Sequence, residues 1–461
     1  RRTLKKGKEQ GRGRATGTGR EDEMSHELPV LPPLGEGEWA NWARNQAASP
    51  AAIAEPTDLE DLCRTVGSAR GPIRPVGTGH SFTPLCVTDG TLIRLDRLAG
   101  VRSADTGAHT ARLQAGTSLK AASAELERHG LAFRNLGDIN VQTLAGAVST
   151  ATHGTGASFG CLSSEIRAVS LVTANGDVVR ASREHDEALF RAAQVSLGAL
   201  GILADAEIQL TPAYNLHRRV WSQPIADILA SAQARWSEHR NFEFFYIPFS
   251  GHGICIAHDE TGAAPTERAP QNDDEETMGL KAIRDGTLQD IPTRRGILHK
   301  ALAGNEGEDV VGVSWQLLAS PRNVPFKEME YHLPVEGALD VFSALVAQIE
   351  AERPDVFFPI EVRMTAGDEA MLSPFAGAPR ISLAVHAYFE DDHDWFFSIA
   401  EPLLRAGGGR PHWGKLHSLK ASELRALYPE FDAFNAIRRE LDPAGAFLSP
   451  YLAELLGEAP Q

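Results

Sequence analysis

Two glycine-rich stretches in the first third of the chain have the composition of loops that bind a phosphorylated cofactor. The first is Arg74-Pro-Val-Gly-Thr-Gly-His-Ser-Phe82, and the second runs from Asn135 to Gly156 with many glycine, threonine and serine residues. Closely spaced glycines let backbone N–H groups approach a pyrophosphate and form an anion-binding nest. His80 directly follows such a nest and would lie along the bound ligand. An ordinary turn explains either stretch alone, because lone glycine motifs are weak, but the pair is more specific.

Better-known cofactor and catalytic motifs are absent from the sequence. The run Gly154–Gly160 has the wrong second spacing for a dinucleotide fingerprint, and Ser196 lacks the flanking glycine of a nucleophile elbow. The sequence contains neither a Walker A lysine motif nor His-Glu-x-x-His. The four cysteines follow no metal-ligand or disulfide spacing, so we expect no metal site.

Polar residues at strand spacing form a second group of candidates. Glu361 and Arg363 lie two apart in a predicted strand, so their side chains share one face, and the same holds for His386 and Tyr388. A carboxylate beside a guanidinium can bind hydroxyls and stabilise negative charge, while His386 or Tyr388 can help remove a proton. Lys415 follows a Trp-Gly pair. The alternatives are a surface ion pair worth about 0–1 kcal/mol and a core tyrosine.

Composition restricts the classes of function. The 461 residues are 42% hydrophobic and 23% charged, as in soluble globular proteins of more than one sub-domain. A net charge of −16 argues against nucleic acid and against an anionic membrane surface as partners. No stretch approaches the ~20 apolar residues of a membrane span. Unpaired cysteines fit a reducing compartment, so we expect a cytoplasmic location.

The elements that must position these residues are mixed α and β. Around the first glycine-rich stretch we expect short strands at 71–76 and 91–95, and a helix at 118–128 that ends before Gly130. The clearest unit is 165–211, in which Asn175-Gly176 predicts a type I′ turn between two strands. A helix and a further strand, 202–210, complete this unit. The order predicts an α+β fold without regular βαβ alternation.

In these stretches the chain resembles the vanillyl-alcohol oxidase superfamily, and specifically its aldonolactone oxidase and alditol oxidase branch. The resemblance runs from about Ala52 to Ala213, and it resumes at Glu361–Arg363, Val385–Tyr388, Arg410–Lys415 and Phe434–Tyr451. It implies a two-subdomain FAD-binding domain with an α+β substrate-binding cap. The expected organisation is an unstructured leader at 1–45, the FAD-binding domain at 46–213, the cap at 214–409 with a loop or insertion at 262–308, and a C-terminal segment at 410–461 that returns to the flavin.

The resemblance implies FAD as the cofactor, attached covalently through His80 to the 8α-methyl group of the flavin. A neutral imidazole is a competent nucleophile for this attachment. Gly137 matches a position beside the reactive face of the flavin, where a small residue leaves space for oxygen. The remaining cofactor-binding positions that it implies are Gly77, Thr78, Gly79, Ser81, Thr143, Gly146, Thr152, His153, Gly154 and Ile202.

The activity that the resemblance implies is hydride transfer from a carbinol carbon of a polyhydroxylated small molecule to flavin N5, with O2 reduced to H2O2. In this hypothesis Arg363 and Lys415 stabilise charge, Glu361 and Asp138 bind substrate hydroxyls, and His386 is a candidate base. The reaction needs an oriented C–H bond, a proton acceptor and stabilised charge on the reduced ring. The oligomeric state stays undetermined.

Two departures from the family pattern bear on the substrate. Asp138 and Tyr388 stand where members specialised for linear polyols carry small hydroxyl side chains, which changes the volume and polarity of the pocket. We therefore expect an aldonolactone or a larger sugar-like alcohol as readily as a simple alditol. Two alternatives are a dehydrogenase of the same fold that uses a quinone or cytochrome, and a non-catalytic carbohydrate-binding protein. Gly137 disfavours the first, and the intact pair of loops disfavours the second.

Overall fold

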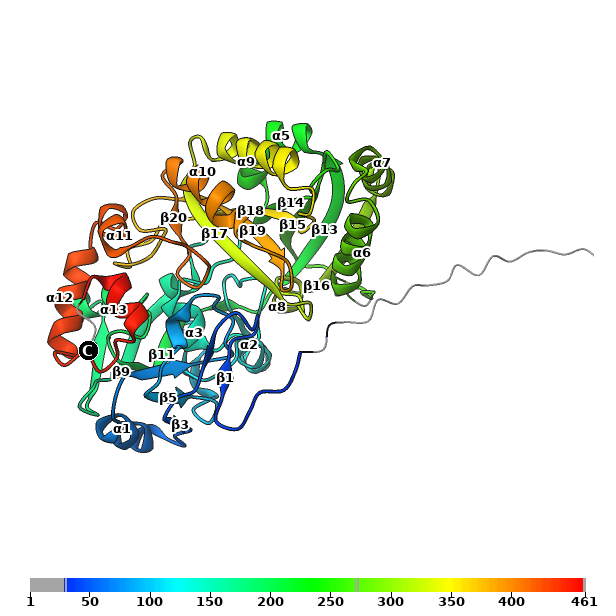
Figure 1. Cartoon of the computed structure of the whole chain (residues 1–461). Helices are drawn as coiled ribbons and strands as arrows, with labels where there is room; N and C mark the ends of the chain where they lie inside the picture. The colour runs from blue at the N-terminus through cyan, green and yellow to red at the C-terminus, as the bar shows by residue number, and fades with distance from the viewer. Residues whose placement is uncertain (1–28, 30, 270, 272, 459–461) are drawn as a thin grey trace, which may run out of the picture.

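The computed structural model describes residues 29, 31–269, 271 and 273–458. Figure 1 shows two halves: the N-terminal part of the chain (blue to teal) lies below, and a large sheet with its helices (green to orange) lies above. The C-terminal helices (red) return to the lower half. The fold is α+β, as the sequence predicts.

Small sheets build the lower half. A parallel sheet has the order β3 (Ala52–Ala54), β5 (Thr91–Arg94), β4 (Ile73–Val76). An antiparallel sheet has the order β10 (Val178–Ser182), β9 (Ile166–Val172), β11 (Ile202–Gln209), β7 (Thr110–Gln114), β6 (Val101–Asp105). Two short pairs are β1 (Trp39–Ala40) with β2 (Ala47–Ala48), and β8 (Leu131–Ala132) with β12 (Thr211–Pro212).

Local sequence explains several of these elements. The hairpin predicted around Asn175-Gly176 is confirmed, because β9 and β10 pair on either side of it. The predicted type I′ turn is wrong, because Asn175 lacks the positive φ that this turn requires; the N–H of Gly176, which has φ +81°, donates to the carbonyl of Thr173 at 2.9 Å. The helix predicted after Ser118 is also confirmed, with the Ser118 side chain accepting from the N–H of Ala121. The helices of this half are α1 (Leu59–Ser68), α2 (Leu119–Arg128), α3 (Leu144–Ser149) and α4 (Glu187–Ala193).

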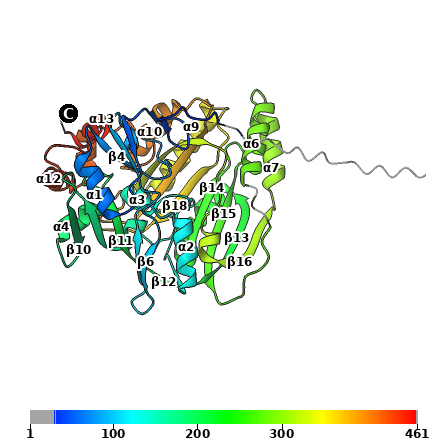
Figure 2. The ribbon, with the colours of Figure 1, turned by 90° about the horizontal axis from the view of Figure 1, so that it is seen from below.

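An eight-stranded sheet forms the upper half. Its order is β16 (Glu306–Val313), β13 (Asn215–Pro224), β15 (His252–Thr261), β14 (Asn241–Tyr246), β18 (Ile360–Thr365), β19 (Arg380–Tyr388), β17 (Phe326–Pro334), β20 (Arg410–Pro411). The helices of this half are α5 (Ile225–Glu238), α6 (Asp273–Gly286), α7 (Ile291–Leu302), α8 (Ser314–Leu317), α9 (Ala338–Glu352) and α10 (Glu401–Ala406). Figure 1 shows α5 and α9 on one face of the sheet, and Figures 1 and 2 show α6 and α7 beside β13, β14 and β15.

The prediction of a loop or insertion at 262–308 is wrong for most of that stretch, which forms α6 and α7 and begins β16. The polar residues that suggested a loop lie partly on the outer surfaces of the two helices and partly, as with Asp273 and Asp274, at the wall of a cavity. Their apolar side chains, among them Leu280, Ile283 and Leu298, pack on Ile247 and Phe249. A narrow apolar stripe on a polar helix is sufficient to anchor it to a sheet.

The N-terminal segment also differs from its prediction. Residues 1–28 and residue 30 lie outside the described residues, so the leader proposed at 1–45 is described only in its last part. There, β1 and β2 pair, and the N–H of Trp42 donates to the carbonyl of Gly79 at 2.8 Å. The Asn41 side chain donates to the carbonyl of Ser81 at 2.9 Å. This segment is structured because the first glycine-rich loop supplies backbone partners for it.

The C-terminal segment joins the two halves. After β20 the chain forms α11 (Ala421–Leu427), α12 (Phe431–Leu441) and α13 (Pro450–Leu456). The N–H of Phe82 donates to the carbonyl of Gly414, and the N–H of Ile73 donates to the carbonyl of Ala446, each at 2.7 Å. Both bonds hold the strand and loop of the first glycine-rich stretch against the C-terminal segment.

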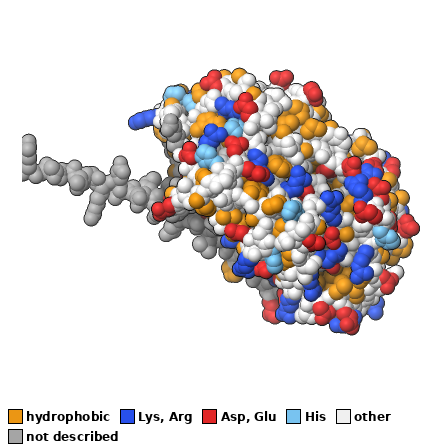
Figure 3. All heavy atoms as spheres, turned by 180° about the vertical axis from the view of Figure 1, so that it is seen from behind, with side chains coloured by type: hydrophobic (Ala, Val, Ile, Leu, Met, Phe, Trp, Pro, Cys, Tyr) orange, Lys and Arg blue, Asp and Glu red, His pale blue; other side chains and the backbone are white. Residues whose placement is uncertain are grey.

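The surface mixes charges of both signs. On the face in Figure 3, acidic and basic side chains intermingle with scattered hydrophobic groups. Within the described residues, no helix has both the length and the apolar character that crossing a bilayer requires.

Candidate active site

A cavity of about 290 Å³ lies where the upper sheet meets the loops of the lower half. A second cavity of about 90 Å³ runs along the two glycine-rich stretches. The two cavities share four lining residues, His80, Ser81, Gln142 and Thr150. Most of the predicted cofactor residues and all four predicted catalytic residues therefore line two adjoining cavities.

The first glycine-rich loop makes close contacts that only glycine permits. A Cβ added to Gly77 would lie 2.3 Å from Oγ1 of Thr143, and Gly79 has φ +74°. Thr143 caps α3 by accepting from the N–H of Gly146 at 3.3 Å. The two glycine-rich stretches thus meet, and they line the second cavity with backbone and small side chains.

Buried Arg74 holds this loop in place. Its guanidinium donates to four backbone carbonyls, those of Leu85, Leu197, Gly198 and Phe447, at 2.7–3.0 Å. Burial lowers the pKa of Arg74 to about 10, which still leaves it charged at neutral pH. One side chain thereby links β4 with the turn after α4 and with the C-terminal segment.

The residues along the second cavity fit the pyrophosphate of a dinucleotide. The second cavity is a narrow channel whose walls include Gly77, Gly79, Gly146 and Gly198, and side chains at several of these positions would fill it or displace its walls. Ile202 itself is buried in β11, while its neighbours Gly201 and Leu203 line the channel. The channel is suited to a pyrophosphate that is bound mainly through backbone N–H groups.

His80 stands where the two cavities meet. Its ring stacks on Trp42 with 5.4 Å between centroids, and its Nδ1 lies 3.0 Å from Oγ1 of Thr78. Burial and the nearby charge of Lys415 lower the pKa of His80 to about 4. The imidazole is therefore neutral at pH 7, which is the form that a nucleophilic attachment requires. The sequence offered no motif for Trp42.

The second glycine-rich stretch turns between the two cavities. Gly137 lines the large cavity, and a Cβ there would lie 2.9 Å from the carbonyl oxygen of His153. Thr152 and His153 also line this cavity, whereas Gly154 packs against the carbonyl of Leu136, 2.2 Å from the position of an added Cβ. Gly154 thus serves close backbone packing.

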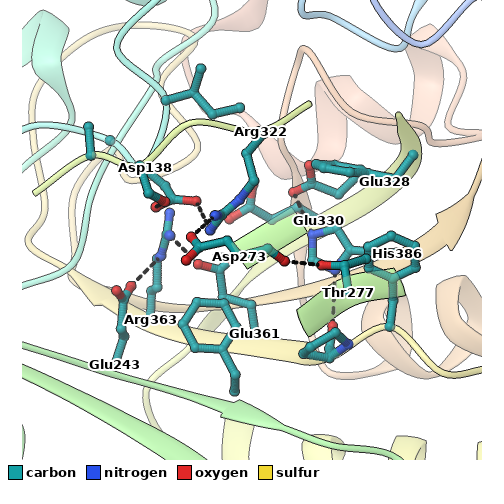
Figure 4. Close-up of a pocket in the computed structure, with 18 of the residues that line it drawn as sticks. Asp138, Glu243, Asp273, Thr277, Arg322, Glu328, Glu330, Glu361, Arg363 and His386 are labelled. Carbon is teal, nitrogen blue, oxygen red and sulfur yellow. Dashed lines mark hydrogen bonds and ion pairs between the residues drawn. The ribbon is translucent and has the colours of Figure 1, made fainter. Parts of the chain in front are cut away.

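Glu361 and Arg363 share one face of β18, as predicted, and both line the large cavity (Figure 4). Each is only 8% exposed, which excludes the surface-pair alternative. Arg363 pairs with Glu361 and also donates through Nε to Glu243 of β14 at 2.7 Å. Burial opposes charge on Arg363, but the two carboxylates raise its pKa well above the ordinary value. Burial raises the pKa of Glu361 well above its usual range.

Asp138 belongs to an ion-pair chain that the sequence did not reveal. Arg322 lies between Asp138 and Asp273 in Figure 4, donating to Asp138 at 2.7 Å and pairing with Asp273 of α6. Burial favours the neutral acid, but Arg322 and Arg363 outweigh it and lower the pKa of Asp138. Asp138 is therefore a carboxylate, and α6 is held at the cavity wall through Arg322.

His386 and Lys415 meet at Glu328, another residue that carried no sequence signal. Lys415 pairs with Glu328, and Nε2 of His386 lies 3.7 Å from the same carboxylate. Nδ1 of His386 lies 3.1 Å from the carbonyl oxygen of Pro359. Burial lowers the pKa of His386, so its imidazole is neutral at pH 7 and able to accept a proton. All three side chains line the large cavity.

Tyr388 is not brought to this cavity by the structure. It is 4% exposed and packs against Phe357 and Phe389, with ring centroids at 6.4 and 4.8 Å. The ammonium of Lys281 lies 5.2 Å from its ring centroid. We therefore correct its assignment from the substrate site to the core, because β19 has passed the end of the cavity by this residue.

A buried histidine cluster forms part of the wall of the large cavity. Glu330 lies 2.9 Å from Nε2 of His153, and the rings of His332 and His412 lie beside that of His153. Burial favours the neutral acid, but the contact with His153 holds the pKa of Glu330 well below its usual value. This pair fixes the ring of His153 from the second glycine-rich stretch against β17.

Two trios of side chains have the composition of metal ligands, namely His153-Glu330-His332 and Glu328-Glu361-His386. The donor atoms within each trio lie within 4.8 Å of one another. In the second trio, Lys415 and Arg363 already neutralise the two carboxylates, so a metal ion would compete with two resident cations. The expectation that the site needs no metal stays a prediction.

Comparison with known proteins supports the resemblance. Residues 206–455 match the family model of D-arabinono-1,4-lactone oxidase, and residues 50–182 match that of an FAD-binding domain. The chain is 33% identical to an L-gulono-1,4-lactone dehydrogenase of Mycobacterium tuberculosis, over 91% of this chain and 99% of that protein. It is 31% identical to an alditol oxidase of Streptomyces, over 90% of this chain and 98% of the relative. A bovine L-gulonolactone oxidase is 28% identical, over 90% of this chain and 97% of the relative.

The fold is also found among solved structures. The crystal structure of cholesterol oxidase from Brevibacterium sterolicum superposes with a TM-score of 0.76 at 18% identity, covering 94% of this chain and all of that one. At this identity the likeness concerns the fold. The family matches, the channel along the glycine-rich loops and the cavity with Glu361 and Arg363 lead to one assignment: the chain is an FAD-binding member of the D-arabinono-1,4-lactone oxidase family.

Proposed function

We propose that this protein is an FAD-dependent oxidase that oxidises a carbinol carbon of a neutral polyhydroxylated substrate and reduces O2 to H2O2. FAD, when bound, supplies the hydride acceptor and the centre at which O2 is reduced. The observation that carries the proposal is the position of Glu361 and Arg363, buried together in a cavity that adjoins the channel along the glycine-rich loops. The relatives named as lactone and alditol oxidases support it.

The residues that would hold FAD are those lining the channel and its junction with the large cavity: Gly77, Thr78, Gly79, His80, Ser81, Gly137, Thr143, Gly146, Thr152 and His153. We assign covalent attachment to His80, because its imidazole is neutral and stands where the two cavities meet. Gly154 and Ile202 line neither cavity: Gly154 allows close packing on the backbone of Leu136, and Ile202 lies between Gly201 and Leu203, which line the channel.

The polar side chains of the large cavity have different roles toward the substrate. Arg363 keeps its charge at every working pH and can stabilise negative charge on the substrate oxygen as the C–H bond breaks. Glu361, held by its pair with Arg363, can accept a hydrogen bond from a substrate hydroxyl. His386 is a neutral base for the carbinol proton, and the neighbouring Lys415–Glu328 pair can stabilise the imidazolium that forms.

The ionised Asp138 selects against anionic substrates. Its carboxylate lines the cavity and accepts from Arg322, and it would repel the carboxylate of a sugar acid. A neutral lactone or alditol avoids this repulsion. Of the relatives, two are named for gulonolactone and one for alditols, so both classes belong in a substrate screen.

The test is a screen of the purified flavoprotein for anaerobic bleaching, with O2 uptake and H2O2 release measured on every compound that bleaches it. Glu361→Gln should slow bleaching at least tenfold, whereas Glu336→Gln, which changes an exposed glutamate outside the cavity, should match the wild type. Failure of every alditol, aldonolactone and sugar to bleach the flavin would refute the proposal. Bleaching that O2 does not reverse, but a quinone does, would replace the oxidase with a dehydrogenase.

A further inference from the structure

One wall of the large cavity is apolar and adjoins the charged residues. On the cavity-facing side of the sheet, Val220 of β13 pairs in register with Ile256 of β15, and Ile256 pairs with Glu243 of β14. In the next row, Ile254 of β15 pairs with Phe245 of β14, which pairs with Glu361. These four apolar residues, Val220, Phe245, Ile254 and Ile256, all line the cavity and are called the apolar wall here.

The apolar wall extends beyond the reach of a single sugar ring. Neighbouring strands lie about 4.8 Å apart, so Val220, three strands from Arg363, lies about 14 Å from it across the sheet. Each residue of the wall is only partly buried. On the opposite face of the sheet, Phe242 and Phe244 of β14 and Cys255 of β15 are fully buried. A bare lactone or alditol held at Glu361 and Arg363 would leave this wall in contact with water.

Helix α6 lies over the wall without filling the space. Leu280 of α6 faces the cavity and, with Leu318, adds apolar surface opposite the strands. The start of α6 is fixed by the pair of Asp273 with Arg322, and Asp274 accepts from the N–H groups of Asn323 and Val324 at 2.9 and 3.1 Å. These contacts hold the helix as a roof over the wall and keep the space open.

We infer that the substrate carries an apolar substituent, an alkyl or aryl group joined to the polyhydroxylated head, and that this group lies against the apolar wall. The inference rests on the proposed function, since it places the head at Glu361 and Arg363. Removal of apolar surface from water stabilises such a complex by about 0.8 kcal/mol per buried methylene, roughly fourfold in affinity. Three or more buried methylenes therefore predict a preference well above tenfold over the unsubstituted head.

The experiment compares matched probes on the holoenzyme by H2O2 release. The pairs are sorbitol with 1-O-hexyl-sorbitol, gulono-1,4-lactone with its 6-O-hexanoyl ester, and methyl with hexyl β-D-glucopyranoside. For a head that is turned over, we expect kcat/KM to be at least tenfold higher with the hexyl or hexanoyl group, mainly through a lower KM. The double variant Val220→Thr/Ile256→Thr should bring that ratio down to threefold or less.

A matched control is Val311→Thr on β16, outside the cavity, which should retain the wild-type ratio. Flavin content and thermal midpoint identify any variant that has not folded, and Ile254→Thr then replaces the double variant. Equal kcat/KM for bare and substituted probes in the wild type would overturn the inference and leave the proposed function standing. An absence of bleaching with any probe would instead contradict the proposed function.

Discussion

Replacement of Arg363 by methionine tests the central electrostatic argument. Methionine keeps most of the length of the side chain and removes the charge, so two buried carboxylates, those of Glu243 and Glu361, lose their shared partner. Truncation of one member of a buried ion pair costs about 3–5 kcal/mol, because the remaining charge stays desolvated. Glu361 escapes part of this cost by protonation, since burial already raises its pKa. Most of the penalty therefore falls on Glu243.

A second substitution separates stability from catalysis. In Arg363→Met/Glu243→Gln the unpaired charge is gone, so we expect roughly half of the lost stability to return. Catalysis should not return, because the charge of Arg363, which stabilises the substrate oxygen, is still missing. Loss of such a group lowers kcat by about 100- to 1000-fold. The expected pattern is a stable protein with impaired activity.

The assay combines urea unfolding of the holoenzyme with the rate of H2O2 release on its best substrate. Arg64→Met is the control, because Arg64 pairs with Glu60 and Asp61 at an exposed site, where an ion pair contributes about 0–1 kcal/mol. If Arg363→Met unfolds within about 1 kcal/mol of the wild type, or if Glu243→Gln restores no stability, the assigned charge network is refuted.

Three further predictions concern the cofactor and the pH dependence. His80→Ala should release flavin into the supernatant on acid precipitation, and colour that also leaves the wild-type pellet would exclude covalent attachment. Gly77→Ala should lower FAD occupancy, because its Cβ would lie 2.3 Å from Oγ1 of Thr143, and Gly77→Ala/Thr143→Ala should recover part of it. Burial lowers the pKa of His258 to about 3. Between this pH and about 6.5, the histidine binds a proton only in the unfolded chain. The free energy of unfolding should therefore decrease as the pH is lowered through this window, by up to about 1.4 kcal/mol per pH unit. His258→Asn removes this one proton, so the urea midpoint of the variant should depend less steeply on pH than that of the wild type. An unchanged slope would contradict the assignment to His258.

The glycine-rich loops were predictable because their chemistry is local. Gly79 has a positive φ, and Gly77 lies so close to the side chain of Thr143 that a Cβ at this position would clash with it. The hairpin at Asn175-Gly176 follows from the same preference. The shared face of Glu361 and Arg363 follows from strand periodicity alone.

Strand periodicity predicts which residues share a face, but not how many of them along that face line the cavity. His386 and Tyr388 do share a side of β19, yet only His386 lines the cavity, while Tyr388 packs among Phe357 and Phe389. Composition likewise failed at 262–308, where polar helix surfaces resembled a loop and α6 became the roof of the cavity. Both errors concern which neighbours cover a surface, and that is a property of the packed molecule.

The sequence by itself determined the cofactor loops, the α+β class and the residue types of the candidate catalytic face, because each depends on backbone preferences over a few residues. Only the tertiary structure showed that Trp42 stacks on His80 and that Arg322 joins Asp138 to Asp273. Asp138 and Arg322 are 184 residues apart along the chain. Contacts of this range arise from the closing of the two halves around one cavity, and no local pattern in the sequence encodes them.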